Sequence, residues 1–180
     1  MATVTLRPNG NGDVNTCDCP SGVHWDAVND VVSDDDATVI IVDGNNSPCI
    51  ELYTIEANSI GVSDTISQIE IFAVLKSEDS KFLDCSFALY LKENSVYTVG
   101  SVYFDATTTY STFSQVFAVK PSNSTAWTKA DIDNLQIGLY SNSDGPGYTY
   151  CTQMYVVVSY TTGSSVAISK KILMNLETDD

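Results

Sequence analysis

The stretch "ISQIEIFAVLK", residues 66–76, decides the fold class of this chain. Its side chains fall into two alternating sets, the first with Ile69, Ile71, Ala73 and Leu75 and the second with Glu70, Phe72, Val74 and Lys76. A period of two residues is typical of a β-strand that packs one face on a core. The richness in Ile, Val and Phe agrees with a strand.

Two further stretches have the same period. "LDCSFALYLK", residues 83–92, alternates Cys85, Phe87, Leu89 and Leu91 with Ser86, Ala88 and Tyr90. "YTYCTQMYVVVSY", residues 148–160, predicts one face with Tyr150, Thr152, Met154, Val156, Val158 and Tyr160. Both stretches are therefore expected to be strands of the same core.

Turn-forming segments separate these strands from further candidates. The breakers are "RPNGNGD", "DGNNSP", "KSEDS", "SNSDGPG" and "TTG". Further strands are expected at residues 2–7, 38–43, 50–55, 109–119, 135–140 and 166–174. About nine strands without a long amphipathic helix predict an all-β, antiparallel β-sandwich of the jelly-roll type. We expect one domain over residues 1–180, ending in an acidic tail at 176–180.

One short helical turn is expected near residues 128–134. Thr128 is a candidate N-cap, and Asp131 supplies the acid three residues later that completes a capping box. Trp127, Ile132 and Leu135 would then face the sheet.

The charge balance excludes several classes of partner. Eight basic residues against 23 acidic ones give a net charge of −15, although only 17% of the residues are charged. Nucleic-acid binding needs clustered Lys and Arg, so we expect no nucleic-acid partner. The longest apolar runs, residues 39–42 and 155–158, are too short for membrane insertion. The start "MATVTLRPNGNGD" lacks the pattern of a signal peptide.

The five cysteines leave their chemistry open. Cys17 and Cys19 are too close to pair with each other, but either can form a disulfide with Cys49. A zinc site from Cys17, Cys19, His24 and Cys49 is the other reading, although the C-x-C spacing is unusual for zinc. Cys85 and Cys151 lie in strands and are expected to be core residues.

Three segments together resemble a known family. They are "TLRPNGNGD", "HWDAVNDVVSDDDATVIIV" and "KPSNSTAWTKADIDNLQIGL", the last followed by "QMYVVVSY". This order resembles the jelly-roll, lectin-like or carbohydrate-binding-module-like domains of virion structural proteins from tailed bacteriophages and archaeal viruses. The resemblance covers residues 3–160 and implies a non-enzymatic decoration, tail or fibre component on the virion surface. The lack of a signal-peptide pattern agrees with assembly in the host cytoplasm. It carries over no catalytic residues.

The aspartate run Asp34, Asp35 and Asp36 has two interpretations. Carboxylate oxygens are ligands for Ca²⁺, so the run predicts a calcium site. The same residues favour an Asx-type turn from Ser33 and Asp34 that ends at Asp36 before a strand. The turn is the favoured interpretation, and we expect no other cofactor.

Other candidate residues are sparse. The one histidine, His24, has no evident catalytic partner and is expected to pack with Trp25 under the sandwich. Six aromatic residues could include a platform that stacks on sugars, although packing in the core or at a protein interface is the favoured interpretation: Tyr97, Tyr103, Phe104, Tyr110, Tyr148 and Tyr150. Asn45 and Asn123 begin Asn-x-Ser/Thr triplets, the first followed by Pro48.

These observations leave three functions. The leading hypothesis is the virion structural protein, with other virion proteins and its own copies as partners, in a trimer or another symmetric oligomer. The alternative is a carbohydrate-binding or adhesive module that recognises host-surface glycans. A small glycan-cleaving enzyme needs only two carboxylates and is the least favoured.

Overall fold

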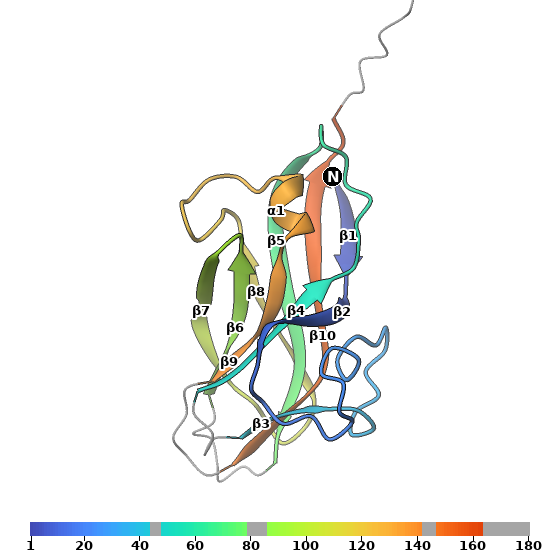
Figure 1. Cartoon of the computed structure of the whole chain (residues 1–180), viewed down its shortest axis with the longest axis vertical. Helices are drawn as coiled ribbons and strands as arrows, with labels where there is room; N and C mark the ends of the chain where they lie inside the picture. Colours follow the sequence, from blue (N-terminus) through green and yellow to red (C-terminus); the bar gives the residue numbers. More distant parts are fainter. Residues whose placement is uncertain (44–47, 79–85, 142–146, 164–180) are drawn as a thin grey trace, which may run out of the picture.

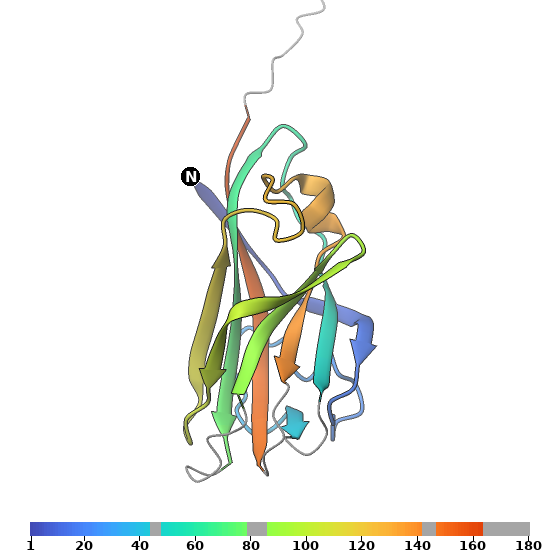
Figure 2. The same ribbon diagram turned by 90° about the vertical axis from the view of Figure 1, so that its left-hand side faces the viewer.

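In the computed structural model, residues 1–43, 48–78, 86–141 and 147–163 are described, and they form two packed antiparallel sheets (Figures 1 and 2). Sheet A has the order β1 (Ala2–Leu6), β10 (Tyr148–Thr161), β5 (Thr65–Ser77) and β8 (Ser111–Phe117), and β3 (Ile40–Asp43) also pairs with β10. Sheet B has the order β2 (Pro8–Asn15), β4 (Cys49–Ile55), β9 (Gln136–Ser141), β6 (Ser86–Glu93) and β7 (Val96–Asp105). The predicted all-β sandwich is confirmed.

The connections are those of a jelly roll. Without β2 and β3, the two sheets read β1-β10-β5-β8 and β4-β9-β6-β7. The chain therefore crosses repeatedly from one sheet to the other, as in two interleaved Greek keys. The strands that are most distant in sequence, β1 and β10, are direct neighbours.

The inner faces follow the predicted alternation in β5 and β6. Ile69, Ile71, Ala73 and Leu75 are completely buried, and so are Phe87, Leu89 and Leu91. These side chains belong to one hydrophobic core between the sheets.

The face assignment within β10 was wrong in one part. The register shifts between Cys151 and Gln153, so Cys151 and Met154 both point into the core. Tyr150 consequently lies on the face opposite to Met154, although both were expected on one face. A β-bulge of this kind exchanges the faces on its two sides.

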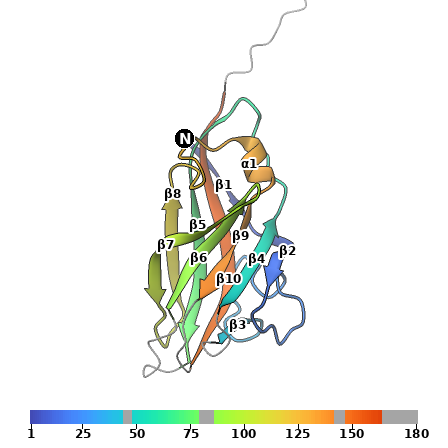
Figure 3. The same cartoon turned by 60° about the vertical axis from the view of Figure 1, so that its left-hand side comes forward.

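The predicted helical turn is α1 (Lys129–Asp133), at the end of the sandwich near the N-terminus (Figure 3). Thr128 is its N-cap, and both bonds of the capping box with Asp131 are present. Trp127, Ile132 and Leu135 are buried, as expected.

Two strands were missed. The segment assigned as the breaker "RPNGNGD" lies mostly within β2, an edge strand whose pairing with β4 is irregular. Gly12 has to be glycine there because a Cβ would come within 2.7 Å of the Leu52 backbone. β7 forms a hairpin with β6 through Asn94, whose φ of 53° is a left-handed conformation that asparagine tolerates.

The predicted strand at 166–174, the tail at 176–180 and Cys85 lie outside the described residues. Among the residues that are described, no helix has the length and apolar character needed to cross a membrane.

Candidate functional site

Four tyrosines share the outer face of sheet B, and we call them the tyrosine face: Tyr90, Tyr97, Tyr103 and Tyr140. They point outward because their neighbours in each strand, such as Leu89 and Leu139, point into the core. The ring of Tyr90 lies 6.3 Å from that of Tyr97 and 5.8 Å from that of Tyr140. Gly138 is opposite Tyr90 and brings no side chain to compete for this space.

The tyrosine face is only partly exposed. Tyr90 is 8% exposed and forms the floor between its two neighbours. Tyr97 and Tyr103, both on β7, are 46% and 53% exposed. Two large rings are therefore presented to solvent on a strand, and one of them rests on a buried ring.

A polar rim of Asp13, Lys92 and Gln136 borders Tyr97. Asp13 accepts hydrogen bonds from Gln136 Nε2 at 2.8 Å and from Tyr97 Oη at 3.0 Å. Its own N–H donates to Gln136 Oε1 at 2.9 Å. Lys92 Nζ pairs with the Asp13 carboxylate and lies 5.4 Å from the centre of the Tyr97 ring.

This network fixes the charges of the rim. The hydrogen bonds from Gln136, Lys92 and Tyr97 lower the pKa of Asp13 to about 2. The same contact with Asp13 raises the pKa of Lys92. Asp13 and Lys92 are thus an ionised pair at neutral pH, and the Asp13 carboxylate holds the Tyr97 hydroxyl in one direction.

A second polar site is a pocket of about 370 Å³ where β5 ends and β10 begins. It is lined by Asp36, Val39, Lys76, Ser77, Glu78, Thr108 and Tyr150. Lys76 contacts both carboxylate oxygens of Asp36, at 2.6 and 2.7 Å, and lies 4.8 Å from the centre of the Tyr110 ring. Tyr110 Oη also donates to Asp36, at 2.9 Å. Asp36, Lys76 and Tyr110 therefore satisfy one another's hydrogen bonds and charge, and these contacts have a structural explanation.

The aspartate run forms a turn before β3. Asp34 accepts from Thr38 Oγ1 at 2.8 Å and from Thr152 Oγ1 at 2.9 Å, whereas Asp36 pairs with Lys76. Asp35 adopts a left-handed φ of 57° and contacts Ser33. The described part of the chain contains no group of three His, Cys, Asp or Glu residues placed to hold a metal ion. The calcium site at Asp34, Asp35 and Asp36 stays a prediction.

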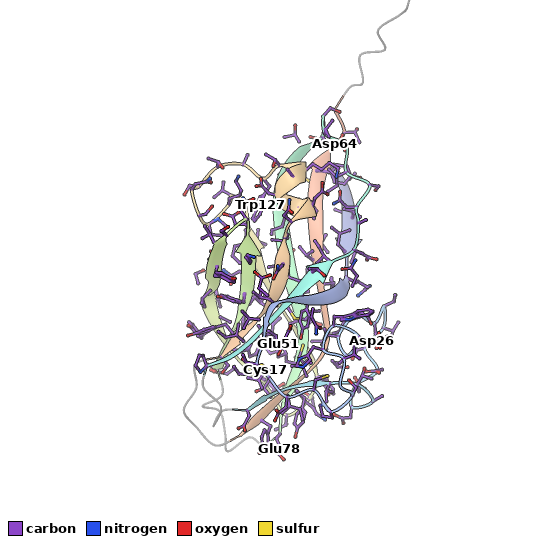
Figure 4. All side chains as sticks on the ribbon, viewed as in Figure 1. Cys17, Asp26, Glu51, Asp64, Glu78 and Trp127 are labelled. Atoms are coloured by element: carbon purple, nitrogen blue, oxygen red, sulfur yellow. A yellow bond between two sulfur atoms is a disulfide. The ribbon has the colours of Figure 1, made fainter. Side chains whose placement is uncertain are left out.

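The zinc interpretation was wrong because two of its ligands form a disulfide. Cys17 is bonded to Cys49, as one of the two expected pairings, while Cys19 is a free thiol. Glu51 lies beside Cys17 of the disulfide (Figure 4). Its buried carboxylate accepts from Cys17 N at 2.8 Å and contacts His24 Nδ1 at 3.1 Å. Burial raises the pKa of Glu51. His24 thus anchors a loop on β4.

The six aromatic candidates do not form one cluster. Tyr97 and Tyr103 lie on the tyrosine face. Phe104 points inward, with its ring 5.6 Å from that of Phe87. Tyr150 lines the second pocket, and the ring of Tyr110 contacts Lys76 of the same pocket. Tyr148 lies on β10, as Tyr150 does.

Sequence reasoning missed five residues of this site, namely Asp13, Tyr90, Lys92, Gln136 and Tyr140. The alternation of residues 83–92 did place Tyr90 on the outer face. No comparable signal marks Asp13, which lies in the segment interpreted as a turn.

No family model matches the chain, and the search of curated proteins found no match. Among similar solved structures is a "xylan-binding module CBM15", with a TM-score of 0.47 and 10% sequence identity. The match covers 91% of this chain and 99% of that one.

Proposed function

We propose that this protein is a carbohydrate-binding module whose ligand lies on the tyrosine face of sheet B. The observation that supports the proposal is the exposed ring of Tyr97, which is held between the buried Tyr90 ring and the ionised pair of Asp13 and Lys92. Tyr103 extends the same exposed strand.

The chemistry of sugars fits this arrangement. A pyranose presents an apolar C–H face that packs on an aromatic ring, and hydroxyls at its edge that both donate and accept hydrogen bonds. Hydrogen bonds to ionised groups such as Asp13 and Lys92 are stronger than those between neutral groups. Because Tyr97 is already fixed by Asp13, binding costs little side-chain entropy at this ring.

The charge of the face favours a neutral glycan. Lys92 is balanced by Asp13, so no unpaired cation of the rim is left to attract sulfate or uronate groups. The net charge of −15 further repels anionic polymers.

Replacing Tyr97 or Tyr103 by alanine is expected to weaken glycan binding about tenfold, the effect of roughly 1.4 kcal/mol that one aromatic contact supplies. Affinity electrophoresis in gels that contain neutral polysaccharides, followed by calorimetry with the matching oligosaccharide, measures the effect. Tyr97→Phe keeps the ring but removes the bond to Asp13, so it separates stacking from hydrogen bonding.

Tyr148→Ala is the matched control, because Tyr148 is 37% exposed but lies on β10. Its binding should equal that of the wild type. The proposal fails if the Tyr97 and Tyr103 variants bind like the wild type, or if all three variants lose the same affinity.

The non-enzymatic role stays a prediction. A glycosidase requires a general acid with a raised pKa, whereas the pKa of Asp13 in the rim is lowered. The pKa of Glu51 is raised, but this carboxylate is buried beside the Cys17–Cys49 disulfide and is held by Cys17 N and His24. Assaying the same polysaccharides for new reducing ends tests this prediction directly.

A virion structural protein, implied by the family resemblance, is a second candidate. It is supported by β7, which ends sheet B and contains no Lys, Arg or Pro to prevent pairing with another chain. Val96 and Val102 of this strand are 43% and 45% exposed. Sedimentation is then expected to give a trimer or another symmetric oligomer, and a strict monomer at high concentration would contradict self-assembly.

A further inference from the structure

The loop between β8 and α1 contains the triplet Asn123-Ser124-Thr125, which neither the sandwich core nor the tyrosine face uses. All three residues are exposed. The loop lies at the end of the sandwich that carries α1 (Figure 2). The Asn-x-Thr pattern is the acceptor sequence for N-linked glycosylation.

The geometry of the triplet brings the Asn123 amide and the Thr125 hydroxyl together. Asn123 Oδ1 accepts from Thr125 Oγ1 at 2.7 Å and from Thr125 N at 3.0 Å, and Ser124 between them has a φ of 57°. Both bonds engage the amide oxygen. Among the described residues no hydrogen-bond partner is found for Asn123 Nδ2, so the nitrogen that would carry a sugar is free at an exposed position.

The loop offers room for a glycan without unfolding. Lys120 N donates to Thr125 O at 2.9 Å, and Ser124 N donates to Lys120 O at 2.8 Å, which closes the loop on itself. Trp127 anchors its base in the core. A group attached at the exposed Asn123 therefore displaces no packed side chain.

We infer that Asn123 is an acceptor site for an N-linked glycan. This inference is independent of the proposed carbohydrate binding. The co-reactant is a lipid-linked oligosaccharide pyrophosphate together with the transferase that uses it. The Nδ2–C1 bond forms as the C1–O bond to the pyrophosphate breaks, the Nδ2 proton passes to a base of the transferase, and the lipid pyrophosphate leaves.

The disulfide points to the same kind of compartment. A disulfide such as Cys17–Cys49 persists in oxidising surroundings and is rare in a reducing cytosol. Transfer of a glycan from a lipid-linked donor likewise takes place outside the cytosol.

The test translates the full chain, behind a cleavable leader, into microsomes that contain the lipid-linked donor. The leader's removal and protection from added protease identify the translocated molecules. In these molecules we expect a mass increase of one glycan that a glycan-removing amidase reverses. Asn123→Gln and Thr125→Val should both abolish the increase, whereas Thr125→Ser should retain part of it because the hydroxyl is kept.

Asn45→Gln is the matched control, because Pro48 directly follows the triplet at Asn45 and makes it a poorer acceptor. It should leave the mass increase unchanged. An unmodified translocated chain would overturn the inference, and so would a mass increase that persists in Asn123→Gln. Circular dichroism of the Thr125→Val protein, expected to match the wild type, shows that the loss does not come from unfolding.

Discussion

Replacing Trp127 by alanine is expected to lower the free energy of unfolding by about 3–5 kcal/mol, the range for large aromatic side chains removed from cores. Trp127 is 3% exposed, and it belongs to the core that joins the two sheets. Its Nε1–H donates to Phe117 O at 2.9 Å, so the variant also removes this hydrogen bond to β8. Denaturant unfolding followed by circular dichroism measures the loss.

Two further variants separate the contributions to this effect. Trp127→Phe keeps most of the apolar volume but removes the hydrogen bond, so it should be less destabilising than Trp127→Ala by at least 1 kcal/mol. Val119→Ala is the surface control: Val119 is 44% exposed in the same loop region, and we expect a change of less than about 0.5 kcal/mol. A Trp127→Ala protein as stable as the wild type would show that the indole is not part of the core.

The sandwich was predictable because its long strands alternate between side chains that face the core and side chains that face outward. Residues 66–76 and 83–92 alternate strictly, and in the described parts of these stretches the sets that contain Ile69 and Leu89 are the ones that face the core. α1 was predictable for a similar reason, since the capping box of Thr128 and Asp131 is a local interaction. Local patterns of this kind are visible in the sequence because both partners lie within a few residues.

The bulge in β10 is different because it depends on a distant segment. Met154 N donates to Val28 O, a bond to a loop far away in the sequence, at the point where the register with β5 shifts. No pattern in residues 148–160 predicts that contact. The predicted alternation was therefore continued across the bulge, and Tyr150 was assigned to the wrong face.

The candidate site shows the same division. The outward direction of Tyr90 follows from the alternation within β6, but the polar rim joins Asp13 to Gln136 across 123 residues. Asp13 also lies in β2, a segment that was predicted to be a turn because of its glycines. Gly12 is there because the backbones of β2 and β4 approach closely, a requirement that only the folded sheet reveals.

Removing the disulfide with the double variant Cys17→Ser and Cys49→Ser is expected to cost about 3–4 kcal/mol, the chain-entropy value for a loop of this length. The two cysteines are 32 residues apart, so the bond constrains a long loop in the unfolded chain. In the folded chain it holds the segment whose Asn15 Nδ2, Cys17 N and His24 Nδ1 all contact the Glu51 carboxylate. Denaturant unfolding without reductant gives the measurement.

The wild type unfolded in the presence of a thiol reductant should match the double variant, because both lack the cross-link. Cys19→Ser is the control, since Cys19 is a free thiol and should change the free energy of unfolding by less than about 0.5 kcal/mol. If Cys19→Ser were as destabilising as the double variant, the bond would join Cys19 to Cys49 instead. That result would also release Cys17, whose N–H is the donor that Glu51 holds at 2.8 Å, and the loop would have to be anchored in a different way.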